Sequence, residues 1–209
     1  MQGRHLLCFI VMLPTPVSFR SSVVQKVLLH AHNQGKRFSV IAVDSRPLLE
    51  GKSLLLALSS ALPPIPCTYA LLPALPSVVN AASIVLLGAH SLHSNGAVYS
   101  RSGTALVAMM AKENNVPVVV CCETYKFSES VMLDGFGKNE LGKTFDCFVC
   151  HSDGLAPKRF SFPDPPTNNL EILDPLYDLT PPSCITAVVT EVGLIPPSSI
   201  SSIPGRTTV

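Results

Sequence analysis

Three short motifs in this sequence combine residue types that could bind or transform a ligand. The first is GKNELGKT (Gly137–Thr144), which matches the phosphate-binding pattern G-x-x-x-x-G-K-[ST]. Such a loop needs a buried strand before it and a helix after it, so that backbone amides point at the phosphate. The preceding MLDGF makes a poor strand and the following FDCFVC is strand-like, which argues against a nucleotide cradle. A P-loop nucleotide-binding protein stays an alternative, decided by whether Lys143→Ala removes ATP or GTP binding.

The second and third motifs contain potential metal or haem ligands. CFVCH (Cys147–His151) has the pattern of covalent haem attachment and of half a zinc site. No second CxxC pair accompanies it, and Phe148 and Val149 fit a plain apolar strand. His90 and His93 lie three residues apart, but no third ligand is evident, so we interpret them as hydrogen-bonded loop histidines. We predict neither a metal nor a cofactor.

The elements that must position such residues follow a regular pattern. Short apolar runs alternate with segments of helical length, of which Thr104–Glu113 is the clearest helix. The runs are Phe38–Val43, Cys67–Leu72, Ser83–Leu87 and Val116–Cys121. This alternation predicts an α/β fold with a parallel sheet that helices cover on both faces. Ligands of such sheets bind at the carboxyl ends of the strands, here Asp44–Arg46, Gly88–Gly96 and Glu123–Tyr125.

Further elements are predicted towards the two ends of the chain. A helix should begin at Ser21 or Ser22 and end at Gly35. Its apolar face would carry Val24, Val27, Leu28 and Ala31. Residues 143–169 contain four prolines and little periodicity, which predicts an irregular insertion. A second helix is predicted from Thr180 to Gly193, followed by an extended C-terminal tail. The apolar face of that helix would carry Ile185, Val188 and Val189.

Composition excludes some classes of function. The 209 residues include 15 basic and 14 acidic side chains, a formal net charge of +1, so nothing electrostatic favours nucleic acid or an anionic membrane. Only 14% of residues are charged, where soluble domains usually have about 25%, and none lies in Ser53–Ser100. Prolines interrupt that segment too often for a spanning helix, so we expect it to form buried core.

The first twenty residues do not fit the α/β pattern. Leu6–Val17 has the length of a signal-peptide apolar region, but it contains two prolines and no small-residue cleavage site follows. We interpret residues 1–20 as an apolar segment outside the domain, with a targeting signal as the alternative. The chain has seven cysteines, an odd number, and Cys121 and Cys122 end an apolar run. This usage indicates reduced thiols and favours the cytosol.

Five strings in the sequence are similar to a known family. They are VDSRPLLEG (Val43–Gly51), LLGAHSLHSNGAVYSRSGTALVA (Leu86–Ala108), NVPVVVCCETYKFSE (Asn115–Glu129), NELG (Asn139–Gly142) and LYDLTPPSCITAVVTEVGLIP (Leu176–Pro196). They resemble the regulatory subunits of eukaryotic translation initiation factor 2B. Among its alpha, beta and delta subunits, CCETYKF and the C-terminal string are most similar to delta. The resemblance covers residues 21–142 and 170–200.

The resemblance implies a single Rossmann-like domain over residues 21–200, followed by a tail at 201–209. Relatives of that family include sugar-phosphate isomerases such as methylthioribose-phosphate isomerase, whose acid/base Asp corresponds to His90 here. Their catalytic cysteine corresponds to VSFR (Val17–Arg20), which has no thiol. With both groups absent, the resemblance implies no catalytic residue. An isomerase acting on ribose or methylthioribose phosphates stays the alternative.

Two groups of candidate residues follow from the resemblance. The first is what remains of the isomerase pocket, with polar types that suit phosphate: Asp44, Arg46, His90, Asn95, Gly96, Ser100, Arg101, Gly103 and Thr104. The second is a set of possible contacts with partner proteins: Glu123, Tyr125, Lys126, Asn139, Glu140, Tyr177 and Asp178.

The function that the resemblance implies is that of a non-catalytic regulatory subunit. It would act in the cytosol, within the complex that exchanges guanine nucleotide on translation initiation factor 2. Its partners would be the other subunits of initiation factor 2B and initiation factor 2 itself, with no nucleic acid and no membrane. Members of the family carry a helical domain ahead of the region matching Ser21, and use it to contact the phosphorylated alpha subunit of initiation factor 2. We therefore expect this chain to be a C-terminal-domain fragment without the helical domain.

Overall fold

A seven-stranded sheet forms the centre of the fold. The computed structural model describes residues 7–12, 23–45, 51–135, 139–141 and 173–203. The strand order is β11-β10-β7-β4-β1-β2-β3, and all neighbouring strands are parallel except β10 and β11. The strands are β1 (Leu7–Met12), β2 (Phe38–Asp44), β3 (Cys67–Leu71), β4 (Ile84–Gly88), β7 (Val118–Cys121), β10 (Ala187–Thr190) and β11 (Gly193–Ile195). This topology confirms the predicted Rossmann-like α/β fold.

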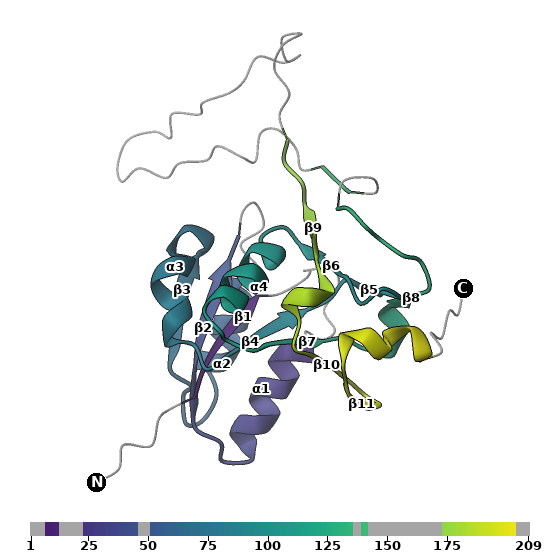
Figure 1. Cartoon of the computed structure of the whole chain (residues 1–209). Coiled ribbons are helices and arrows are strands. Elements are labelled where there is room, and N and C mark those ends of the chain that lie inside the picture. Colours follow the sequence, from purple (N-terminus) through teal and green to yellow (C-terminus); the bar gives the residue numbers. More distant parts are fainter. Residues whose placement is uncertain (1–6, 13–22, 46–50, 136–138, 142–172, 204–209) are drawn as a thin grey trace.

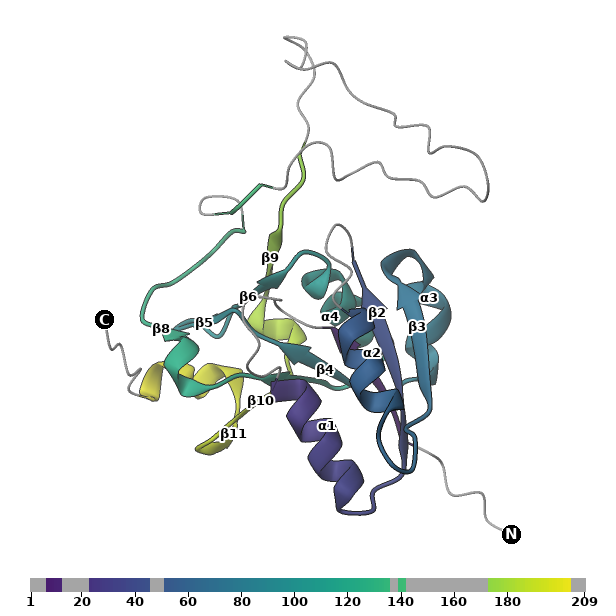
Figure 2. The same cartoon turned by 180° about the vertical axis from the view of Figure 1, so that it is seen from behind.

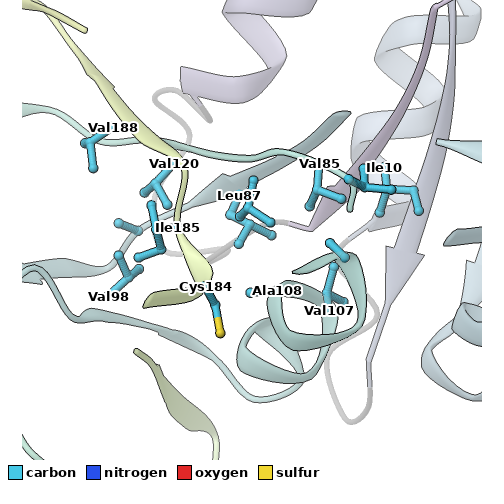
Figure 3. Close-up of a cluster of buried hydrophobic side chains, with 14 of the residues drawn as sticks. Ile10, Val85, Leu87, Val98, Val107, Ala108, Val120, Cys184, Ile185 and Val188 are labelled. Carbon is cyan, nitrogen blue, oxygen red and sulfur yellow. The ribbon is translucent and has the colours of Figure 1, made fainter. Parts of the chain in front are cut away.

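Helices cover both faces of the large sheet (Figures 1 and 2). They are α1 (Val23–Asn33), α2 (Gly51–Ser59), α3 (Leu75–Val78) and α4 (Thr104–Glu113). Side chains alternate along a strand, so Ile10 and Val11 of β1 enter different cores. The core on the α4 side, drawn in Figure 3, includes Ile10, Val85, Leu87, Val107, Ala108 and Val188. The core beneath α1 and α2 includes Val11, Val24, Leu28, Leu54 and Leu58.

A second, four-stranded sheet lies at the carboxyl ends of β4 and β7. Its order is β8-β5-β6-β9, with β5 (Ser91–His93), β6 (Val98–Arg101), β8 (Phe127–Ser128) and β9 (Tyr177–Thr180). Only Ala89 and His90 separate β4 from β5, and the 3₁₀ helix η3 (Thr124–Lys126) joins β7 to β8. Ser100 Oγ of β6 donates to Gly88 O at the end of β4 over 3.0 Å. The small sheet therefore lies at the edge where ligands of such folds bind.

The chain leaves this sheet after β8 and returns to it through a short antiparallel contact. Leu141 and Pro175 form an isolated bridge, and Leu176 N donates to Glu140 O over 2.9 Å. The two ends of the intervening segment are thus held side by side. The predicted insertion at 143–169, the CFVCH motif and most of GKNELGKT lie outside the described residues.

Several predicted elements are confirmed. α4 has the predicted bounds, and the four predicted strands appear as β2, β3, β4 and β7 within two residues of the predicted ends. α1 ends before Gly35, whose φ of +76° is easy for glycine. Val27, predicted on the apolar face of this helix, is 39% exposed instead. No helix in the described part of the chain has the length and hydropathy needed to cross a bilayer.

The N-terminal segment differs from the sequence interpretation. Leu7–Met12 is not outside the domain but is β1, which pairs with both β2 and β4 at the middle of the sheet. Ile10 and Val11 are 0% and 1% exposed. A continuous apolar run such as this suits a strand that is buried on both faces. The prolines that made this segment look irregular come after the strand ends.

The C-terminal part also differs from the prediction. No helix runs from Thr180 to Gly193; a 3₁₀ turn, η5 (Pro182–Cys184), leads into β10, which pairs with β7. The β-branched residues of β10 favour a strand, and the unpaired edge of β7 supplies its partner. Gly193, with φ of +126°, turns the chain into β11 rather than ending a helix. The segment after Gly193, predicted to be extended, contains the 3₁₀ helix η6 (Pro197–Ser202), and Ile200 within it is buried.

Candidate functional site

The carboxyl ends of the parallel strands meet beside the small sheet. β1 occupies the middle of the large sheet, and the chain runs from it to β2 and β3 on one side, then to β4, β7 and β10 on the other. Such a reversal of strand order opens the crevice in which ligands of Rossmann-like sheets bind. Of the predicted pocket residues, Asp44 ends β2 and His90 follows the end of β4, so both belong to this edge.

Asp44, at the end of β2, is buried and bonded to its own chain. Its Oδ2 accepts hydrogen bonds from Gly51 N and from the Tyr69 hydroxyl, both over 3.0 Å, and its Oδ1 accepts one from Ser45 N over 3.1 Å. Burial, followed by the hydrogen bond and charge of Asp44, raises the pKa of Tyr69 to about 12. Asp44 thus joins β2 to α2 and β3, and its role toward a ligand stays a prediction. Arg46 lies outside the described residues.

His90 lies at the end of β4 against a stack of aromatic rings. Its ring centroid is 5.1 Å from that of Tyr177 and 6.0 Å from that of Tyr99. The two tyrosines stack on each other at 4.9 Å, and Arg101 Cζ lies 4.7 Å from the centroid of Tyr177. We call these four residues the aromatic stack. It brings together two predicted pocket residues, His90 and Arg101, and one predicted partner contact, Tyr177.

The charge state of His90 follows from this environment. The side chain is exposed overall, but partial burial first, then the positive charges of Lys126 and Arg101, lowers its pKa, and Glu140 opposes the shift. The shift favours the neutral imidazole, at the position where the resemblance implies a carboxylate in the isomerases. Sequence reasoning did not include Tyr99 among the candidate site residues. Alternation along β6 could have identified it, because Tyr99 and Arg101 must lie on the same face of that strand.

The polar residues after β7 form an ion pair with each other and hydrogen bonds to other parts of the chain. Lys126 Nζ lies 2.8 Å from Glu123 Oε2 and donates to Ala89 O over 3.2 Å. Thr124 N and its hydroxyl both donate to the carboxylate of Glu191. Tyr125, by contrast, is 65% exposed. Of the predicted partner contacts in this segment, Tyr125 is the one whose side chain is open to solvent.

Asn95 and Gly96 form the tight turn between β5 and β6. Asn95 Nδ2 donates to Met132 O over 2.8 Å, and its Oδ1 accepts from Ala97 N over 3.3 Å. Gly96 has φ of +80°, and a Cβ there would lie 2.7 Å from Pro197 O. The turn is thus packed against other parts of the chain rather than against the aromatic stack.

The N-terminus of α4 is built from three further pocket candidates. Thr104 Oγ1 donates to Arg101 O over 2.6 Å, and the hydroxyl of Ser100 is bonded to β4 as described. Gly103, with φ of +101°, donates its amide to Asp178 Oδ2 over 2.6 Å. Asp178 Oδ2 also accepts from Ala105 N over 3.0 Å. These polar groups hold α4 against β6 and β9.

Asn139 clamps the start of β9. Its Nδ2 donates to Tyr177 O over 2.6 Å and to Gly135 O over 2.8 Å, while its Oδ1 accepts from Tyr177 N over 3.1 Å. This residue belongs to GKNELGKT, so one side chain of that motif is bonded to β9. Glu140, the next residue, is exposed.

A groove of about 470 Å³ runs beside β9, and no sequence motif predicted it. Its lining residues are mostly apolar, and include Met109, Met132, Leu133, Leu179, Pro181 and Pro182. Asp134 and Asp178 are the acids in its described lining. Leu133 is 87% exposed and Met109 is 44% exposed. Its walls come from segments far apart in the chain, so no local pattern could reveal it.

No metal centre is evident among the described residues, where no three His, Cys, Asp or Glu side chains gather. His93 is buried, with Nε2 3.3 Å from Ser91 Oγ and Nδ1 3.1 Å from Ser130 Oγ, which confirms a hydrogen-bonded histidine. Burial raises the pKa of Cys121 to about 11 and that of Cys122 to about 12, so both remain thiols.

Comparison with curated proteins finds two kinds of relative. The chain is 41% identical over 184 residues to translation initiation factor eIF2B subunit delta of Schizosaccharomyces pombe and 42% identical over 180 residues to that of Dictyostelium discoideum. These matches cover 88% and 86% of this chain, but only 39% and 29% of the relatives. The chain is also 35% identical to ribose 1,5-bisphosphate isomerase of Pyrococcus furiosus, over 85% of this chain and 51% of that enzyme.

Comparison with solved structures gives the same family. The tetrameric eIF2B-beta2-delta2 complex from C. thermophilum matches with a TM-score of 0.66 and 32% identity, over 88% of this chain and 50% of the other. The Pyrococcus horikoshii OT3 translation initiation factor eIF-2B matches with a TM-score of 0.64 and 25% identity, over 91% of this chain and 58% of the other. The model of the initiation factor 2 subunit family matches residues 15–197, which include the aromatic stack and every strand of the large sheet except β1. The chain belongs to the initiation factor 2 subunit family.

Proposed function

We propose that this protein is a non-catalytic, delta-like regulatory subunit of the guanine nucleotide exchange factor for translation initiation factor 2. The observation that carries the proposal is His90. At the position where the resemblance implies the acid/base Asp of isomerases, the chain has an imidazole that lies against the ring of Tyr177. The higher identity to delta subunits than to the Pyrococcus furiosus isomerase supports the same reading.

The internal bonding of the pocket candidates also supports a role without catalysis. Asp44, Asn95 and Ser100 each direct side-chain polar atoms at the backbone of this chain. A pocket that turned over a sugar phosphate would need such groups to be available to substrate. In this protein they join strands, turns and helices, as expected where a former pocket serves to keep a surface rigid.

The proposed partners are the other subunits of initiation factor 2B and initiation factor 2 itself. A beta–delta complex is among the similar structures, which supports a role in assembly. The exposed Tyr125 and Glu140, together with the apolar groove beside β9, offer surface for such contacts. The cytosol is the proposed site of action. Neither nucleic acid, a membrane nor a cofactor is part of the proposal.

A binding experiment tests the regulatory-subunit proposal. The full chain is co-expressed with intact alpha and beta subunits, and each is used in turn as the bait. We expect stable co-purification, weakened by Tyr125→Ala. Leu62→Ala, at a side chain that is 90% exposed but outside the predicted contacts, is the matched control and should bind normally. Absence of association with either subunit would contradict the proposal.

An isomerase is the second candidate, favoured by the identity to ribose 1,5-bisphosphate isomerase. We expect no turnover of ribose 1,5-bisphosphate or methylthioribose 1-phosphate above a blank, with the Pyrococcus furiosus enzyme as positive control. Activity that disappears in His90→Ala would establish catalysis at the aromatic stack and overturn the non-catalytic reading.

A further inference from the structure

One wall of the groove beside β9 is a short segment after β8 whose backbone is fixed at two points. At its start, Asn95 Nδ2 donates to Met132 O over 2.8 Å. Three residues later, Asn139 Nδ2 donates to Gly135 O over 2.8 Å. Gly135 also packs on β9, because a Cβ there would lie 3.4 Å from Leu179 N. This wall is therefore held in place by other parts of the chain, and does not hang free beside the groove.

Between the two fixed points, the wall presents a large apolar side chain to solvent. Leu133 is 87% exposed, although the carbonyl groups of Met132 and Gly135 on either side of it are hydrogen-bonded. Met109 of α4, which also lines the groove, is 44% exposed. Leu106, three residues earlier on the same side of that helix, is 47% exposed. Large apolar side chains that a fixed backbone exposes around one groove are typical of an interaction surface.

The size and charge of the groove limit what can cover these side chains. Its volume of about 470 Å³ lies in the range of binding pockets, roughly 300 to 1,000 Å³, and accommodates a few side chains of one segment. Its described lining includes the acids Asp134 and Asp178 but no Lys, Arg or His. Asp134 is exposed, and its charge gives the apolar groove a negative potential. An apolar segment with a basic side chain is therefore complementary to the groove, and an acidic segment is not.

We propose that this groove binds an apolar segment of the beta subunit of initiation factor 2B, with a lysine or arginine of that segment beside Asp134. The inference rests on the proposed function, under which a beta subunit is a partner of this chain. The beta–delta complex among the similar structures supports that occupant over a second copy of this chain. Leu133 and Met109 are the side chains that the segment covers. Because the backbone that carries Leu133 is already fixed, covering it costs little ordering entropy.

Binding of the intact beta subunit to variants of the full chain tests the groove. We expect Leu133→Asp to weaken the affinity about 30-fold or more, the loss typical of a central interface residue. Val131→Asp is the matched control, because Val131 is in the same segment and 62% exposed but does not line the groove. Its affinity should change less than about 3-fold. Both side chains are exposed, so neither substitution disturbs the core. Equal losses in the two variants overturn the proposal.

The salt dependence of association tests the charge of the occupant. Asp134→Asn keeps the shape of the side chain and removes its charge. We expect it to slow association about 3- to 10-fold at low salt and to make association less sensitive to added salt. An association rate that is the same in this variant and the unaltered chain at every salt concentration overturns the basic occupant.

A measurement on the unaltered chain keeps the proposal testable if a variant does not fold. The methyl NMR signals of Met109 and Met132 should shift when intact beta subunit is added. If the beta subunit binds but neither these signals nor Leu133→Asp responds, the groove is not its site, while the proposed function stands. If the beta subunit does not bind at all, both proposals fail. A dimer of the chain alone that Leu133→Asp dissociates, measured by sedimentation, identifies a second copy as the occupant and also overturns the proposal.

Discussion

The large and the small sheet of this protein are held together in different ways. Strands of the large sheet, β11 apart, pair in parallel and bury apolar residues on both faces, as β4 does with Leu86 and Leu87. Strands of the small sheet are two to four residues long, and polar side chains fix their positions: Asn139 clamps β9, Asp178 holds it on α4, and Ser100 ties β6 to β4. The stability of the large sheet therefore depends on the apolar area that it buries. The position of the small sheet depends instead on individual hydrogen bonds.

The largest effect is expected from a cavity in the large sheet. Leu87→Ala removes a fully buried side chain from the core of Figure 3, and should lower the free energy of unfolding by about 3 kcal/mol. Urea unfolding followed by circular dichroism measures this loss. Leu56→Ala on α2, where the side chain is 69% exposed, is the control and should change stability by less than about 0.5 kcal/mol. Equal losses in both variants would remove the distinction between core and surface.

A smaller loss is expected at the turn of the small sheet. Gly96→Ala places a Cβ 2.7 Å from Pro197 O on a backbone with φ of +80°, and should cost about 2 to 3 kcal/mol. Gly35→Ala is matched, because φ there is +76° but no atom lies within 4 Å. Its cost should be only about 1 kcal/mol, from backbone strain. If thermal unfolding shows the same loss for both, the contact between the turn and η6 contributes nothing.

The clamp on β9 should contribute about 1 to 2 kcal/mol. Asn139→Ala removes both hydrogen bonds to the backbone of Tyr177 and the one to Gly135 O. Because the clamp is local, hydrogen exchange should accelerate in β9 while Leu87 and its neighbours in β4 remain protected. Asn114→Ala, which loses one hydrogen bond to Met110 O at the end of α4, is the control. Uniform acceleration in both sheets would show that they unfold as one unit.

The smallest effect is expected at the ion pair after β7. Glu123 and Lys126 are partly exposed, so Glu123→Gln should change stability by less than about 1 kcal/mol, and less still in high salt. Chemical denaturation at low and high salt measures this. A loss of several kcal/mol would place this pair among the supports of the small sheet.

The large sheet could be predicted well from the sequence because its signals are local. Continuous apolar runs mark β2, β4 and β7, and helical periodicity marks α4. β1 was missed because the prolines that follow it suggested an irregular segment. β10 was mistaken for a helix because a short apolar run reads the same in both structures, and its pairing with β7 decides between them.

The candidate site could be located but not assembled from the sequence. Strand ends pointed to Asp44 and His90, but the partners that define their roles are distant in the chain. Asp178 is 75 residues from Gly103, and Asn139 is 38 residues from Tyr177. Such contacts depend on the fold as a whole. Sequence reasoning therefore placed Asn139 and Asp178 among outward contacts, whereas their described hydrogen bonds are made within the chain.

The bridge between Leu141 and Pro175 bears on how the start of β9 is positioned. It pairs two residues that are distant in the chain, directly before β9. The entropy of closing a loop grows only with the logarithm of its length, so a doubling costs about 0.6 kcal/mol. We therefore expect a change in the number of residues between Leu141 and Pro175 to cost less stability than an insertion within either sheet.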